Sequence, residues 1–157
     1  SRVELRRESR ALLEEMREVS GLTVHLAVAQ GADTLYLERL PTLRGMQAMS
    51  EYRRRWPLHA TSSGKAICAY DPVATQARIE AGFPPFTPNT IASREAFLAQ
   101  LAQVRRLGYA TASEEVMLRL ASVAAPVETA FMPHAFTPAA DIAMMRHERQ
   151  GTRLFAT

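Results

Sequence analysis

The spacing of hydrophobic residues changes from a helical to a strand-like period within the first forty residues. Over residues 2–19, apolar side chains recur every three to four positions between Arg and Glu, which predicts an amphipathic helix that stops at Gly21. Residues 22–28 and 34–40 instead alternate, and the turn-forming residues between them predict an antiparallel hairpin. Residues 46–49 are expected to form a third short strand, before Pro57 breaks the chain.

The middle of the chain has the pattern of two consecutive helices. Residues 61–70 begin with three hydroxyl side chains and a glycine, which is typical of a helix start with free backbone N–H groups. Asp71 and Pro72 then predict an N-cap and the first residue of a helix that runs to about Glu80. Three prolines exclude regular structure over residues 83–88.

The last third of the chain predicts helices and strands in turn. A helix is expected over residues 93–107, ended by Gly108, and strands are expected over residues 109–115 and 120–127. Residues 139–149 predict a last, weaker helix. Together the elements predict an α+β fold in which helices flank an antiparallel sheet.

Composition narrows the class of protein. The chain has 157 residues, 47% hydrophobic and 22% charged, which fits one globular domain and excludes disorder. No apolar run approaches the roughly 18 residues that span a bilayer, and the Arg-rich N-terminus does not resemble a signal peptide. Because Cys68 is the only cysteine, a disulfide framework and a Cys-pair metal site are excluded. A cytoplasmic domain without membrane contact is expected.

The net charge of +3 comes from one segment of the chain. Between Arg44 and Lys65, basic residues outnumber the single acid Glu51, and the run 53–55 is three consecutive arginines. The run suggests contact with nucleic acid or an organic anion, or a solvated turn. No aromatic or glycine-rich nucleic-acid motif accompanies it, so DNA binding by this chain alone is not expected.

The sequence Thr-Ser-Ser-Gly-Lys-Ala at 61–66 admits several chemical interpretations. It is not a phosphate-binding P-loop, because His59 and Ala66 occupy two required positions. Ser62 and Lys65 have the spacing of a serine–lysine nucleophile, but the other elements of such enzymes are missing from the sequence. A helix start with free N–H groups favours a carboxylate instead, and the alternative is a capped helix with nothing bound.

Other reactive residue types have structural explanations. The four histidines lack metal-ligand spacing, so no metal or cofactor is predicted. Glu114 and Glu115 would point to opposite faces of a strand, which favours ion pairing or capping over paired acid–base catalysis. His25 is expected to be structural, and Cys68 is expected to be a core thiol.

Three ordered sequence blocks resemble one protein family. The first is Pro-Leu-His-Ala-Thr-Ser-Ser-Gly-Lys-Ala at 57–66. The second runs from Leu101 through Gly108-Tyr109-Ala110 to Glu114-Glu115, and the third is Val-Ala-Ala-Pro-Val at 123–127. Over residues 3–127 their order and separations are similar to the C-terminal effector-binding domain of IclR-type bacterial transcription regulators.

The resemblance implies a GAF-like (profilin-like) α+β domain that binds a small organic acid and forms homodimers or tetramers. In such regulators an N-terminal winged helix-turn-helix reads DNA, and residues 1–20 would follow the linker from it. No helix-turn-helix pattern is present in these 157 residues, so the chain is expected to be a single effector-binding domain. The alternatives are a small hydrolase-like enzyme that uses Ser62 or Lys65, and a degenerate domain that only associates.

The resemblance also implies the effector site. Backbone N–H groups of Ser62 and Ser63 would hold the carboxylate. Ala112 stands where the family usually has aspartate, and Ser122 where it often has cysteine. The remaining wall positions would be Ala48, Trp56 and Leu120, with Met46 and Met49 beside them. With Ala112 in place of aspartate, the site is expected to be more apolar and to accept an aromatic or branched acid.

One position and one segment depart further from the family pattern. Arg119 stands where a glycine is common. Residues 128–157 follow a different pattern, and the segment 128–136 includes Pro133, which cannot sit in a central strand.

Overall fold

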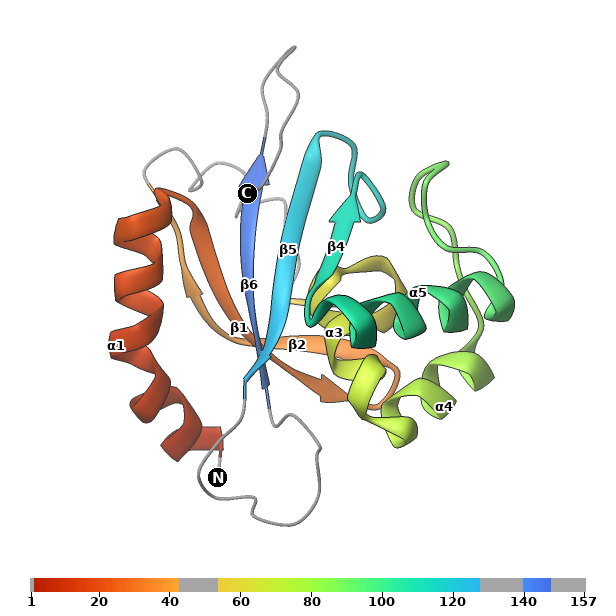
Figure 1. The fold of residues 1–157 in the computed structure, drawn as a ribbon, viewed down its shortest axis with the longest axis horizontal. Coiled ribbons are helices and arrows are strands. Elements are labelled where there is room, and N and C mark those ends of the chain that lie inside the picture. The colour runs from red at the N-terminus through yellow and green to blue at the C-terminus, as the bar shows by residue number, and fades with distance from the viewer. Residues whose placement is uncertain (1, 43–53, 128–139, 148–157) are drawn as a thin grey trace.

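The structure, a computed structural model, describes residues 2–42, 54–127 and 140–147. In these ranges the chain forms a sheet with helices on both faces (Figure 1). The elements are α1 (Arg2–Ser20), β1 (Thr23–Gln30), β2 (Asp33–Leu40), β3 (Arg55–Pro57), the 3-10 turn η1 (Leu58–Ala60), α3 (Ser62–Tyr70), α4 (Pro72–Ala81), α5 (Arg94–Leu107), β4 (Ala110–Ser113), β5 (Leu120–Val127) and β6 (Ala140–His147).

The strand order is β3-β2-β1-β6-β5-β4, and every neighbouring pair is antiparallel. The expected hairpin β1–β2 is confirmed. The two strands expected over residues 109–115 and 120–127 are present as β4 and β5, which pair with each other, and β6 joins β5 to β1. Gly31, with φ of 60°, supplies the left-handed residue that the tight β1–β2 turn requires. The predicted α+β class is therefore confirmed.

The helix expected over residues 139–149 is wrong, because Ala140–His147 form the strand β6 between β1 and β5. The alanines and methionines of this segment favour a helix locally. Without β6, however, β1 and β5 would each leave a row of backbone N–H and C=O groups unpaired inside the sheet. This tertiary demand overrides the local propensity. The segment 128–136 with Pro133 lies outside the described residues.

Strand β3 is an element that the sequence pattern does not indicate. Residues Arg55–Pro57 pair with β2 at one edge of the sheet, where a terminal proline is tolerated. The third strand expected over residues 46–49 lies outside the described residues.

Helix α1 covers one face of the sheet. Its buried side chains Leu5 and Leu13 pack with Val24, Leu26 and Leu40 of the hairpin. The predicted apolar stripe is confirmed for Leu5, Leu13 and the partly buried Met16, whereas the predicted members Leu12 and Val19 are exposed. An ion pair of 2.7 Å between Arg6 and Glu38 adds an exposed contact.

Helices α3, α4 and α5 lie on the opposite face, with α3 innermost (Figure 1). Residues 62–69 of α3 are all buried, which is feasible because most of them are small. A Cβ on Gly64 would lie 2.0 Å from the carbonyl oxygen of Leu58, so α3 and η1 are in direct backbone contact there. With helices on both sides, β1 is buried on both faces, and His25 is fully buried opposite the side covered by α1. Cys68 is buried in the core, as predicted.

The predicted helix boundaries on this face are also confirmed. Asp71 caps α4 by accepting hydrogen bonds from the N–H groups of Val73 and Ala74, and Ser93 caps α5. Gly108 ends α5 in a left-handed conformation with φ of 80°. These caps fix where α4 and α5 begin and where α5 ends.

Candidate functional site

The start of α3 is a buried helix N-terminus with two backbone donors to spare. Thr61 is the N-cap: its Oγ1 accepts from Gly64 N at 2.9 Å, and its carbonyl oxygen accepts from Lys65 N at 3.1 Å. The first four N–H groups of a helix have no intrahelical partner, which leaves those of Ser62 and Ser63. Within the described ranges neither donates a hydrogen bond, and the fully buried Ser63 Oγ has no partner there either.

The structure brings the predicted polar residues together. Ser62 Oγ lies 2.6 Å from Ser122 Oγ of β5, so a hydroxyl–hydroxyl bond links the helix start to the sheet. Ser122 lies directly opposite Ala112 in the β4–β5 register, and the methyl group of Ala112 is buried. The predicted grouping of these side chains is thus seen in the fold, while their contact with a ligand stays a prediction.

The predicted apolar wall residues also converge. Trp56 and Leu120 belong to one buried cluster on the α3 side of the sheet, which we call the wall cluster; its members are Ala27, Tyr36, Trp56, Ala60, Val116 and Leu120. Leu120 is two residues before Ser122 and therefore shares its face of β5. Phe86 packs edge-on against Trp56, with ring centroids 5.4 Å apart. The other predicted wall residues, Met46, Ala48 and Met49, lie outside the described residues.

Lys65 forms a buried ion pair that the sequence pattern does not reveal. Its ammonium nitrogen lies 2.9 Å from Glu115 Oε1 and 3.1 Å from Oε2, and only 1% of the Lys65 side chain is exposed. Burial lowers the pKa of Lys65, and the neighbouring carboxylate opposes that shift. The expected ion-pairing role of the Glu114–Glu115 doublet is thereby confirmed for Glu115.

His59 is a second residue whose environment sequence reasoning missed. Its Nε2 donates to the carbonyl oxygen of Pro84 at 3.0 Å, and the ring packs edge-on against Phe83. Burial lowers the pKa of His59 to about 4; the hydrogen bond to Pro84 opposes this shift, and the charges of Arg78 and Lys65 add to it. The imidazole is therefore neutral at pH 7 and holds the segment after α4 against η1. The described residues contain no group of acids, histidines and cysteines arranged to hold a metal ion.

Comparison with known proteins decides the family. The family model for the bacterial transcriptional regulator IclR C-terminal domain matches residues 1–137. The chain belongs to this family. The IclR resemblance of the three sequence blocks is thus confirmed, and β6 lies beyond the matched residues.

The curated relatives of this IclR domain are transcription regulators. The HTH-type transcriptional regulator XynR of Escherichia coli is 36% identical over 127 residues, which cover 80% of this chain and 50% of XynR. The glycerol operon regulatory protein of Streptomyces coelicolor is 33% identical, with coverage of 79% and 49%. The chain thus spans about half the length of these relatives. The names of these relatives argue against the alternative of a hydrolase-like enzyme. A nucleophilic serine would also need a neighbouring base, whereas Ser62 Oγ contacts the hydroxyl of Ser122.

Solved structures share the IclR fold. The C-terminal domain of the E. coli regulator KdgR superposes with a TM-score of 0.76 at 26% identity, covering 91% of this chain and 81% of that domain. An IclR homolog from Microbacterium hydrocarbonoxydans, solved with 4-hydroxybenzoate, gives a TM-score of 0.81 at 22% identity and covers 96% of this chain and 61% of that protein.

The described helices include none long and apolar enough to cross a bilayer.

Arg119 occupies a left-handed backbone position, with φ of 63°. Only glycine adopts this conformation without a steric penalty from Cβ, which explains why a glycine is common there in the family. Replacing Arg119 with glycine is expected to raise the free energy of unfolding by about 0.5 kcal/mol. Urea denaturation of the two proteins measures the change, and a loss of stability would contradict the strain.

Proposed function

We propose that the chain is the effector-binding and oligomerisation domain of an IclR-type transcription regulator in the cytoplasm. It senses a small organic acid and controls DNA binding by a winged helix-turn-helix that precedes it in the full protein. It binds its effector without catalysing a reaction. One observation carries the proposal: at the buried start of α3, two backbone N–H groups and the hydroxyl of Ser63 have no hydrogen-bond partner among the residues that the structure describes.

The ligand class follows from the chemistry at this helix start. Two N–H donors and the positive end of the helix dipole suit a carboxylate. The wall cluster with Trp56 and Leu120 offers apolar contacts beside it, and Ala112 offers no hydrogen bond to a ligand hydroxyl. The site therefore suits an aromatic or branched acid. Two structural neighbours, the Microbacterium homolog and the inducer-binding domain of PobR from Acinetobacter, were solved with hydroxybenzoates.

Signalling requires that the acid bind one arrangement of the N-terminal helices better than another. Helix α1 packs on the face of the sheet opposite α3, so a change at α3 reaches it through β1 and β2. Homodimers or tetramers would couple two such helices. Light scattering of the chain at high concentration tests the assembly, and a mass of one chain would refute it.

A thermal-shift screen tests the proposed function directly. Benzoate, 4-hydroxybenzoate and isovalerate are compared with their neutral amides. At a hundredfold excess over Kd, binding adds about 2.7 kcal/mol to the free energy of unfolding, which raises the melting temperature by several degrees. Stabilisation by at least one acid and by no amide is the expected result. If no acid stabilises the chain, the degenerate association domain is the better interpretation.

A matched pair of variants at Ser62 separates the backbone donor from the side chain. Thr61 has φ of −122° and ψ of 151°, which suits a residue before proline, so Ser62→Pro deletes one N–H and fits the helix start. Loss of a donor to a charged group is expected to weaken carboxylate binding by about ten- to a hundredfold. Ser62→Ala keeps the N–H and should weaken it less than about fivefold. Calorimetry on both variants decides, and equal losses would mean that the hydroxyl, not the backbone, holds the acid.

A further inference from the structure

The ion pair between Lys65 and Glu115 connects the start of α3 to the segment between β4 and β5. Lys65 lies in the first turn of α3, three residues after Ser62. Its ammonium group donates to both carboxylate oxygens of Glu115 and, at 3.0 Å, to Gln100 Oε1 of α5. A lysine has three N–H donors, so the structure uses all of them in fixed directions. The ammonium group is thus held to two elements other than α3.

Stability alone gives a poor account of this pair. Burying two charges costs desolvation energy that their attraction often only balances, and apolar side chains of similar volume frequently serve as well. Moreover, a cation in the first turn of a helix lies at the unfavourable end of the helix dipole. The pair provides what apolar residues do not, which is a directional link between two backbone segments.

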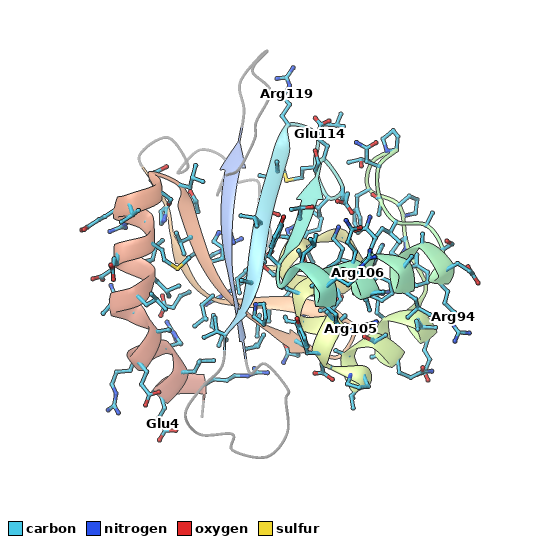
Figure 2. All side chains as sticks on the ribbon, viewed as in Figure 1. Glu4, Arg94, Arg105, Arg106, Glu114 and Arg119 are labelled. Carbon is cyan, nitrogen blue, oxygen red and sulfur yellow. The ribbon has the colours of Figure 1, made fainter. Side chains whose placement is uncertain are left out.

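The segment that Glu115 anchors, residues 114–119, is held by hydrogen bonds on several sides. Glu115 Oε2 also accepts from Ser113 N at 3.0 Å, and the Glu115 carbonyl oxygen accepts from Thr90 Oγ1 at 2.5 Å. At the tip, Glu114 Oε1 accepts from Arg119 N at 2.6 Å, and Figure 2 shows these two residues side by side at the end of the hairpin. These hydrogen bonds hold residues 114–119 in place. The ion pair between Lys65 and Glu115 then fixes this segment relative to α3.

This position matters because the segment supplies part of the wall. Val116, the residue after Glu115, is buried in the wall cluster with Trp56 and Leu120. Ser62 and Ser63 begin the helix that carries Lys65. A single ion pair thus lies between the anion-binding end of α3 and the apolar contacts next to it.

We infer that Lys65 and Glu115 are positioning residues of the effector site, which set the distance between its N–H donors and Val116 and so select the shape of acid that fits. This inference rests on the proposed function. Neither residue touches the acid. A change in the pair therefore alters affinity and the preference between acids even where the fold is kept.

The test separates folding from positioning. In the double variant Lys65→Met/Glu115→Leu the buried pair becomes apolar, and its melting temperature is expected to stay within about 5 °C of wild type. Calorimetry with benzoate and isovalerate should nevertheless show affinity about tenfold weaker, with a changed ratio between the two acids. The matched control, Gln76→Leu/Glu80→Leu, removes an exposed hydrogen-bonded pair on α4 and should leave both dissociation constants within about twofold of wild type.

Each outcome has a distinct meaning. A double variant that folds and keeps the wild-type dissociation constants and their ratio overturns the positioning role. If the double variant does not fold, Glu115→Asp retains both charges and shortens the link by one methylene. It should weaken benzoate binding by about fivefold, and an unchanged affinity would also overturn the inference. Wild-type protein that binds neither acid would instead refute the proposed function and the inference with it.

Discussion

The variant Gly64→Ala is expected to be unable to reach the native fold. The added Cβ would lie 2.0 Å from the carbonyl oxygen of Leu58 and 2.5 Å from its Cα. Both are backbone atoms, so no side-chain rotation can relieve the overlap. To make room, α3 must move away from η1, although residues 62–69 are all buried. The expected loss is on the order of 4 kcal/mol or more in the free energy of unfolding.

Urea denaturation followed by circular dichroism measures this loss, and insoluble expression of the variant would agree with it. Gly108→Ala is the matched control: no atom of the described residues lies within 4 Å of its added Cβ, and the cost is only the left-handed backbone with φ of 80° and ψ of 4°. That control should lose about 1 kcal/mol. A Gly64→Ala protein within about 1 kcal/mol of wild type would show that α3 and η1 are not in close backbone contact.

Elements with strong local signals could be predicted from the sequence. The apolar spacing of α1 and the turn at Gly31 depend on neighbours in the chain, and both were predicted correctly. Strand β6 could not be predicted, because it is a strand only through its pairing with β1 and β5. Strand β3, with three residues, is too short to show a period.

In the candidate site, too, some features could be predicted from the sequence and others only from the fold. The spare donors at Ser62 and Ser63 follow from local capping chemistry, which the sequence contains. The grouping of Ala112 and Ser122 with the helix start came from the family resemblance, and the β4–β5 register explains it. The Lys65–Glu115 pair joins residues 50 positions apart, and no local pattern indicates such a contact. Positions 46, 48 and 49 stay predictions.

The chain is expected to lose about 4 kcal/mol of its free energy of unfolding between pH 7.5 and pH 5 through two buried histidines. Burial, aided by Arg39, lowers the pKa of His25 to about 3, and burial lowers the pKa of His59 to about 4. In the unfolded chain both take up a proton below about pH 6.5, whereas in the folded chain they stay neutral. The unfolded state therefore binds more protons as the pH falls, and stability decreases from about pH 6.5 towards pH 4.

Urea denaturation at pH 7.5 and pH 5 measures this loss, of which each histidine contributes about 2 kcal/mol. His59→Gln provides the internal control, because the glutamine amide can still donate to the Pro84 carbonyl oxygen but does not titrate. Whatever stability this variant loses at pH 7.5, its further loss between pH 7.5 and pH 5 should be about half that of wild type.

A wild-type protein equally stable at both pH values would mean that these imidazoles ionise inside the fold. An undiminished loss in His59→Gln would assign the effect to other groups. The halved loss is expected because His59, seated between the start of α3 and Pro84, is buried without a carboxylate partner among the described residues.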